Sequence, residues 1–176
     1  MPRLWRISNH ADLTGRGGLR AGGRWHSRGH PVVYTTQHPA AALLEALVHL
    51  ELDGSERLPR RFRLLEIEAP DALPTGSLRA ASLARNWRDD EQRTRALGDA
   101  WLRAGRSALL FVPSAIVPRT RNCLLNPLHG DAARPRIVSA VRYPFSTHGS
   151  SDSAVVKSGA EPNGAYFRLS RNSSRS

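Results

Sequence analysis

Three residues with chemically useful side chains lie close together within residues 22–45. Arg24 follows a Gly-Gly pair, which lets the backbone approach a ligand, and arginine can bind an anion through two parallel hydrogen bonds. Tyr34 ends an apolar run over residues 32–34, and its ring can stack on another ring. Glu45 is the only acidic residue in an apolar helix predicted over residues 40–50.

Glu45 is the most unusual of these residues, because apolar residues occupy every side of its predicted helix. We therefore expect most of the helix to be buried, and a buried carboxylate costs free energy unless it is paired or hydrogen-bonded. One interpretation is a carboxylate that faces a cleft and acts in catalysis or in binding a sugar. The alternatives are a glutamate at the helix edge that reaches solvent, or a structural pair with an arginine.

Two further polar residues accompany predicted apolar strands. Ser114 follows the apolar run 108–112 and Pro113, so it is well placed to face a cleft. It lacks a surrounding G-x-S-x-G sequence and an obvious Asp/His relay, so we interpret it as a hydrogen-bonding group and not as a nucleophile. The alternative is a serine that only makes a turn at the strand end. Arg6 interrupts the strand predicted over 4–7, where it either lines the site or lies at the edge of the core.

The elements that must position these side chains follow from the apolar pattern. Strands are predicted over 4–7, 32–34, 61–69, 108–112 and 136–142, helices over 40–50 and 80–105, and turns or loops over 74–77 and 122–129. Pro39 suits the first turn of a helix, Asp89 and Asp90 suit a helix start, and Gly105 suits a helix stop. A chain of 176 residues suits one domain with a real core.

The charge of the chain is strongly positive, at +11, and Lys157 is its only lysine. Arginine favours phosphate contacts, so one interpretation is an anionic partner such as a nucleic acid, a dinucleotide or an acidic protein. The alternative is a compositional bias that replaces surface lysine with arginine. The arginines are scattered and no array of aromatic residues is interleaved with them, so we expect no direct contact with nucleic acid.

Other function classes are disfavoured by single features of the sequence. The lone Cys123 excludes an internal disulfide and cannot by itself build a thiolate metal site, so we expect no metal. No apolar run approaches the ~20 residues of a membrane span. The first residues, MPRLWRIS, lack the apolar segment of a signal peptide, so we expect a cytoplasmic protein without a membrane partner.

The pattern of these residues resembles a known family. It consists of Arg24 in a GGRW turn, Tyr34 ten residues later, Glu45 after an alanine-rich helix start, Ser114 in a Pro-Ser pair, and the sequence N-x-LLNP-x-H over residues 122–129. This combination resembles the RES domain, the toxin of RES–Xre toxin–antitoxin pairs. The resemblance is carried by residues 4–145, and we define residues 1–145 as the domain. Residues 146–176 contain nine serines, and we expect this tail to be mobile.

The resemblance implies a fold and a substrate. The expected fold is a single-domain α+β structure with a split antiparallel β core like that of ADP-ribosyltransferases, packed against helices. The expected substrate is NAD, and no bound cofactor is expected. Members of the family cleave the nicotinamide–ribose bond by hydrolysis or phosphorolysis, and some transfer ADP-ribose to a protein.

The resemblance also implies roles for individual residues. Glu45 would stabilise positive charge on the ribose, and Arg24 would bind the pyrophosphate. Tyr34 would stack on a ring, and Ser114 would fix the nicotinamide ribose or amide. Arg6 and Asn126 would complete the NAD site, Asn126 through the turn that forms its wall. Two positions depart from the family pattern, His26 where asparagine is common and Cys123 where an aromatic residue is common.

Three functions remain open from the sequence. The first is a toxin that consumes NAD and is neutralised by an Xre-like helix-turn-helix antitoxin, with a homodimer allowed. The second is an ADP-ribosyltransferase that modifies a protein or a nucleic acid. The third is a basic nucleic-acid-binding protein without catalysis, which predicts binding that weakens steeply with salt.

Overall fold

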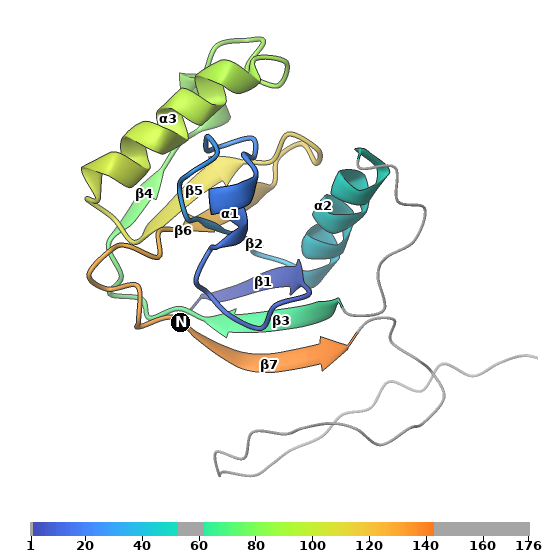
Figure 1. The fold of residues 1–176 in the computed structure, drawn as a ribbon. Helices are drawn as coiled ribbons and strands as arrows, with labels where there is room; N and C mark the ends of the chain where they lie inside the picture. The colour runs from blue at the N-terminus through green and yellow to red at the C-terminus, as the bar shows by residue number, and fades with distance from the viewer. Residues whose placement is uncertain (1, 53–61, 143–176) are drawn as a thin grey trace, which may run out of the picture.

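The computed structural model contains one sheet of seven strands, against which helices pack (Figure 1). The structure describes residues 2–52 and 62–142. The strands are β1 (Arg3–Ser8), β2 (Val33–Thr36), β3 (Arg63–Glu68), β4 (Thr75–Ser77), β5 (Leu109–Pro113), β6 (Arg121–Leu125) and β7 (Arg136–Arg142). The helices are α1 (Gly17–Arg20), α2 (Pro39–Leu52) and α3 (Glu91–Ala104), with a 3-10 turn η1 (Ala80–Ser82). The serine-rich tail predicted over 146–176 lies outside the described residues.

The sheet is split at its centre, between β1 and β2. Its strand order is β4-β5-β6-β2-β1-β3-β7, and every neighbouring pair is antiparallel except the parallel pair β4 and β5. β1 pairs with β3 along its whole length, and β2 pairs with β6 from end to end. In contrast, β1 and β2 are joined at the single pair Trp5 and Thr36. The two halves of the sheet therefore separate beside this pair, and the predicted α+β class with a split core is confirmed.

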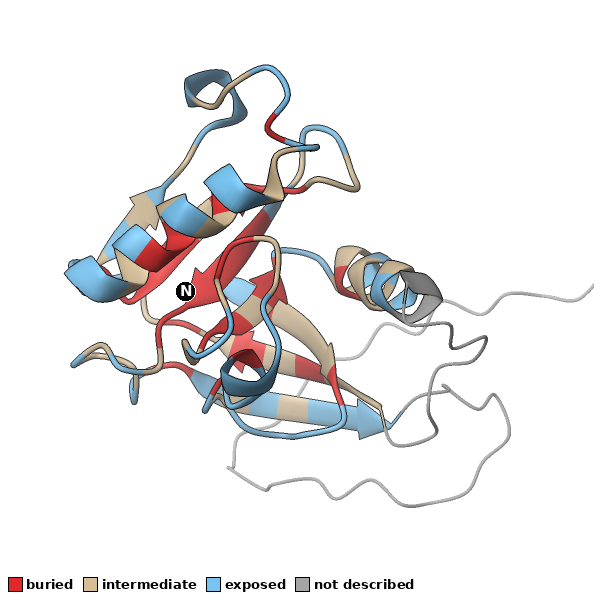
Figure 2. Cartoon of the chain, turned by 45° about the horizontal axis from the view of Figure 1, so that its top comes forward, coloured by how far each residue is buried: buried red, intermediate tan, exposed pale blue. Residues whose placement is uncertain are grey.

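The core lies in two clusters on opposite faces of the strands. Residues alternate between the faces of a strand, so Cys123 and Leu125 of β6 join one cluster while Leu124 joins the other. The second cluster includes Trp25 and Trp87, whose ring centroids lie 5.9 Å apart, and packs beneath α3. Figure 2 shows the buried residues concentrated in the central strands, whereas β7 and the outer face of α3 are exposed.

The helix α2 is much less buried than the sequence suggests. It begins at Pro39 as predicted, but Leu44 and Leu47 are each 39% exposed, and Ala42 is its only buried residue among those whose burial is described. The prediction of a mostly buried helix is therefore wrong. The helix packs on β1 and β2 along one side, and no described element covers its other side (Figure 1).

Three other boundaries differ from the predictions. Residues 83–90 are not helical, and α3 begins only after Asp90, whose Oδ1 accepts a hydrogen bond of 3.0 Å from the Arg93 amide. Gly105 ends α3 with a φ of 56°, in the left-handed region where glycine is favoured. The predicted turn 74–77 contains the short strand β4, and the predicted loop 122–129 begins within β6. None of the described helices is long and apolar enough to cross a membrane.

Candidate functional site

A cavity of about 550 Å³ lies against the half of the sheet that carries β2. Its walls come from the loop around Gly22–His26, from Tyr34, from α2, from the start of α3, and from Ala115 and Ile116 after β5. A smaller cavity of about 130 Å³ adjoins it in the split between β1 and β2. The two cavities share the polar residues Arg6, Tyr34, Glu45, His49 and Asn122. Three of the six predicted site residues are thus brought together at this boundary, and Arg24 joins them in the larger cavity.

The Glu45 carboxylate is held by two neutral hydrogen-bond donors. Its Oε1 accepts one hydrogen bond from Ser114 Oγ at 2.9 Å and another from Asn122 Nδ2 at 2.8 Å. No described arginine forms an ion pair with this carboxylate, so the structural Glu–Arg pair considered above is not observed. Glu45 is instead a charged group whose orientation is fixed by its neighbours at the wall of a cavity.

Ser114 acts on the site through Glu45. Its Oγ accepts hydrogen bonds from the backbone amides of Ile116 at 3.2 Å and Val117 at 3.0 Å, and its proton is donated to Glu45. The side chain is 2% exposed and does not line either cavity. The hydrogen-bonding interpretation of this serine agrees with the geometry, and its bonds to two backbone amides explain why a serine directly follows β5.

Asn122 is a candidate site residue that the sequence reasoning missed. The sequence assigned it to a loop, but it lies in β6, opposite Thr36 of β2 and Val112 of β5, and is 7% exposed. Its Nδ2 reaches Glu45 from the face of the sheet that carries the larger cavity. The available signal was an amide side chain directly before the apolar residues 123–125, because a buried polar group must find a partner.

Tyr34, which is half-buried, and the buried His26 form a pair beneath the loop. Tyr34 Oη accepts a hydrogen bond from the Trp25 amide at 3.0 Å and lies 2.9 Å from His26 Nδ1. Burial raises the pKa of Tyr34, so the phenol stays protonated, and burial lowers the pKa of His26, so the ring is neutral. With the imidazole proton on Nε2, Nδ1 accepts a hydrogen bond from the Tyr34 hydroxyl. The hydroxyl is then held by two hydrogen bonds, one from the Trp25 amide and one to His26.

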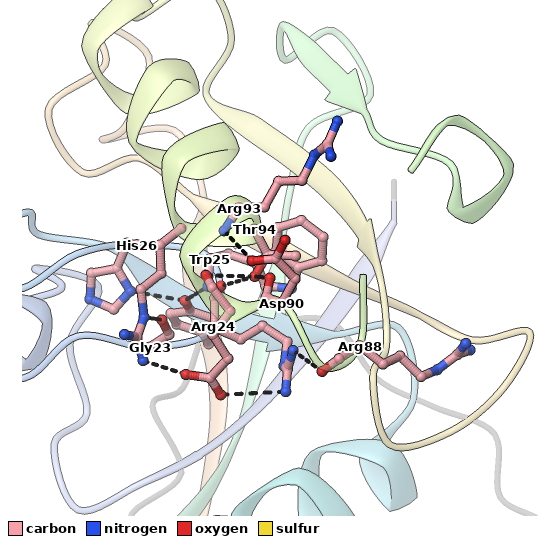
Figure 3. Close-up of polar contacts among 11 residues, drawn as sticks. Gly23, Arg24, Trp25, His26, Arg88, Asp90, Arg93 and Thr94 are labelled. Carbon is pink, nitrogen blue, oxygen red and sulfur yellow. Dashed lines mark hydrogen bonds and ion pairs between the residues drawn. The ribbon is translucent and has the colours of Figure 1, made fainter. Parts of the chain in front are cut away.

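Arg24 is anchored by α3 and the turn that precedes it (Figure 3). Its Nη1 donates to the Arg88 carbonyl at 2.7 Å, and its Nη2 lies 3.4 Å from Glu91 Oε1. Its backbone carbonyl accepts a hydrogen bond of 2.8 Å from Thr94 Oγ1. The arginine side chain therefore lines the larger cavity in a defined orientation, as an anion-binding role requires.

The loop that carries Arg24 and His26 is packed tightly on α3. Asp99 Oδ1 accepts a hydrogen bond of 2.8 Å from the Ser27 amide. A Cβ on Gly98 would lie 1.7 Å from the Trp25 carbonyl oxygen, so this position has no room for any side chain. These contacts with α3 set the position of the Arg24 loop.

The remaining predicted residues divide between the cavity and the core. Arg6 lines both cavities, burial lowers the pKa of its guanidinium, and it donates no hydrogen bond to a side chain among the described residues. Asn126 is 2% exposed, accepts a hydrogen bond of 3.0 Å from the Leu128 amide, and lies outside the lining of both cavities. His49, which was not among the predicted site residues, also lines both cavities.

Cys123 belongs to the core and lines neither cavity. It is fully buried, and burial raises the pKa of its thiol to about 12, so it is not a thiolate nucleophile. Among the described residues, no group of three or more histidine, cysteine, aspartate or glutamate side chains is arranged to hold a metal ion.

Comparison with solved structures agrees with the fold. The complex titled M. tuberculosis MbcT-MbcA toxin-antitoxin contains a chain of the same fold, with a TM-score of 0.65 at 20% identity over 80% of this chain and 82% of that one. This fold is thus one that a bacterial toxin–antitoxin complex contains.

Sequence relatives narrow this class to one family. The RES domain matches residues 3–146. The Toxin Res of Pseudomonas putida is 49% identical over 134 residues, which cover 76% of this chain and 90% of that toxin. The Prs ADP-ribosylating toxin of Sphingobium sp. is 40% identical over 140 residues, which cover 73% of this chain and 84% of that toxin. The chain therefore belongs to the RES domain family of toxins, as its sequence pattern predicts.

Proposed function

We propose that this protein is the toxin of a toxin–antitoxin pair and that it consumes NAD by cleaving the nicotinamide–ribose bond. The observation that carries this proposal is the Glu45 carboxylate, fixed by Ser114 and Asn122 at the wall of a cavity that also presents Arg24. The volume of about 550 Å³ lies within the range of pockets that enclose ligands of this size.

Glu45 supplies the charge that this reaction needs. As the bond breaks, both electrons go to the nicotinamide nitrogen, which leaves as a neutral group, and positive charge develops on the ribose. A carboxylate oriented in advance stabilises that charge without reorganising during the reaction. An oxygen of water or phosphate then forms the new bond to the ribose carbon and releases a proton.

The cationic and aromatic residues suit the rest of the substrate. Arg24 can bind the pyrophosphate through charge-assisted hydrogen bonds. Arg6 interacts electrostatically with Asp12 but donates no hydrogen bond to a described side chain, so its guanidinium can still bind an anionic ligand. Tyr34 also lines the cavity, where its ring can stack on a ring of the ligand.

Product analysis tests the reaction directly. Purified protein is incubated with NAD, with and without inorganic phosphate, and the products are separated and identified. We expect free nicotinamide in both reactions, with ADP-ribose as the partner product of hydrolysis and a phosphorylated ADP-ribose as that of phosphorolysis. A folded protein that leaves NAD intact in both reactions would refute the proposal.

Growth of a bacterial host tests the toxin role and its antitoxin. We expect expression of the chain to arrest growth while cellular NAD falls, and co-expression of a cognate helix-turn-helix antitoxin to protect the cells. The support for such a partner is that a structural neighbour is described within a toxin–antitoxin complex. A well-expressed protein with normal growth and normal NAD would count against this role.

Transfer of ADP-ribose to a protein is a second candidate. It is favoured by the relative that is named an ADP-ribosylating toxin and is 40% identical to this chain. In this case the nucleophile that replaces water is a side chain of the target. NAD labelled in its adenylate part should then leave label on a macromolecule in a cell extract, whereas hydrolysis or phosphorolysis leaves it only on small products.

A further inference from the structure

A bridge of one carboxylate between two arginines lies in the wall of the larger cavity. Glu91 Oε1 lies 3.4 Å from Arg24 Nη2, and Glu91 Oε2 contacts Nη2 of Arg95. All three residues line the cavity of about 550 Å³. Each oxygen of one carboxylate thus engages a different guanidinium, as the two phosphate groups of a diphosphate would.

We propose that Arg24 and Arg95 form the two arms of a diphosphate subsite, and that Glu91 is an internal anion that occupies this subsite until a ligand displaces it. The inference rests on the proposed function, and it adds Arg95 as a second binding residue and Glu91 as a residue that sets affinity. The ligand class is a nucleoside diphosphate or a dinucleotide joined through a pyrophosphate.

Both arginines have hydrogen-bond partners other than the glutamate. Arg95 Nε donates a hydrogen bond of 2.8 Å to the Gly23 carbonyl, and Arg24 Nη1 donates one of 2.7 Å to the Arg88 carbonyl. Each guanidinium is therefore held by a backbone group and directs a further N–H group toward Glu91. Removing the carboxylate would leave two oriented donors, and oriented guanidinium groups are the preferred ligands of phosphate oxygens.

Other contacts already hold α3 to the loop. Asp90, and not Glu91, caps the helix, and Thr94 and Asp99 bind the loop backbone through Arg24 and Ser27. The Glu91 side chain is 46% exposed, so its ion pairs are screened by solvent. Because the ion pairs are screened, a ligand can displace the bridge. Because other contacts hold α3 to the loop, the bridge contributes little to that packing.

The consequence is that Glu91 lowers the affinity for a diphosphate. It competes for both arginines, and after displacement its negative charge stays close to the bound phosphates. The variant Glu91→Gln removes the charge and keeps the volume, so we expect the Kd for inorganic pyrophosphate and for ADP-ribose to fall about three- to tenfold. The variant Arg95→Gln should raise both values by a similar factor or more.

A matched control exists on the opposite part of the sheet. Glu68 also bridges two arginines, at 3.3 Å from Arg3 and 3.2 Å from Arg136, but it lines neither cavity. Isothermal titration of the wild type, Glu91→Gln, Glu91→Ala, Arg95→Gln and Glu68→Gln with pyrophosphate and ADP-ribose tests the subsite without any cleavage. We expect tighter binding in both Glu91 variants and no change in Glu68→Gln.

The outcomes separate this inference from the proposed reaction. Unchanged or weaker binding in both Glu91 variants would overturn the subsite, and a lower melting temperature in the same variants would show that the bridge is structural. The same gain in Glu68→Gln as in Glu91→Gln would overturn it as well, because the effect would then follow from net charge alone. Tighter binding by the Glu91 variants of a protein that leaves NAD intact would support the subsite and refute the NAD-cleaving function.

Discussion

Replacing Glu45 with glutamine should abolish NAD cleavage while preserving the fold. Glutamine keeps an oxygen that can accept the hydrogen bonds from Ser114 Oγ and Asn122 Nδ2, which now measure 2.9 and 2.8 Å. It removes the negative charge that the proposed ribosyl transition state requires. The change therefore isolates charge from geometry more cleanly than any other substitution at this position.

The size of the effect follows from these contacts. Loss of one oriented electrostatic group costs ~10²–10³ in rate, or about 2.7–4 kcal/mol of transition-state stabilisation. The two hydrogen bonds to Glu45 become neutral, which weakens each by about 1 kcal/mol, but the desolvation cost of a partly buried charge is removed. We therefore expect the free energy of unfolding to change little and substrate binding, which depends mostly on Arg24, to be retained.

The assay measures nicotinamide release and thermal melting on the same preparation. Glu45→Ala is the companion variant, because it leaves the donors of Ser114 and Asn122 without an acceptor, at a cost of about 1–3 kcal/mol for a buried group. We expect Glu45→Ala to lose both activity and stability, and Glu45→Gln to lose activity alone. A glutamine variant that melts early and yet cleaves NAD at the wild-type rate per folded molecule would refute the reasoning.

Three further changes test the surroundings of the site. Ser114→Ala should lower turnover, because Glu45 loses one of its two hydrogen-bond donors. It should also destabilise the fold by about 1–3 kcal/mol, because two backbone amides lose their acceptor. Wild-type kinetics in this variant would contradict a positioning role. Gly98→Ala should reduce both activity and melting temperature, since its Cβ would lie 1.7 Å from the Trp25 carbonyl oxygen, and an unchanged melting curve would be inconsistent with that contact. The pKa of His26 is lowered by burial from 6.5, so below about pH 6.5 the unfolded chain binds a proton that the folded chain does not, and stability should fall as the pH falls. The variant His26→Gln should lose this component of the pH dependence in urea titrations, and identical pH profiles for the two proteins would argue against it.

The sequence by itself predicted most strands and the family. Apolar runs and breakers placed β1, β2, β3, β5 and β7 within a few residues, because local pattern and turn residues act over short distances. The spacing of Arg24, Tyr34 and Glu45 and the RES resemblance also came from sequence, since these residues lie in one short segment and need no knowledge of distant contacts.

The predictions of burial and of strands failed where they depended on contacts between elements that are distant in the sequence. α2 is apolar all round, which predicts burial on every side, but the sheet contacts only one side and leaves Leu44 and Leu47 partly exposed. β6 lies between β2 and β5 and is buried on both faces, so it lacks the alternation that marks a half-buried strand. The sequence analysis looked for that alternation and therefore assigned Asn122 to a loop.

The partners of the candidate catalytic carboxylate were decided by tertiary structure alone. Ser114 and Asn122 lie 69 and 77 residues from Glu45 in sequence, and only the pairing of β5, β6 and β2 beside α2 brings them within hydrogen-bond distance. The bridge of Glu91 between Arg24 and Arg95 depends in the same way on the packing of α3 against the loop. Sequence pattern thus identified which side chains could carry the chemistry, whereas long-range packing decided which atoms orient them, because hydrogen-bond partners are set by distance in space and not by distance along the chain.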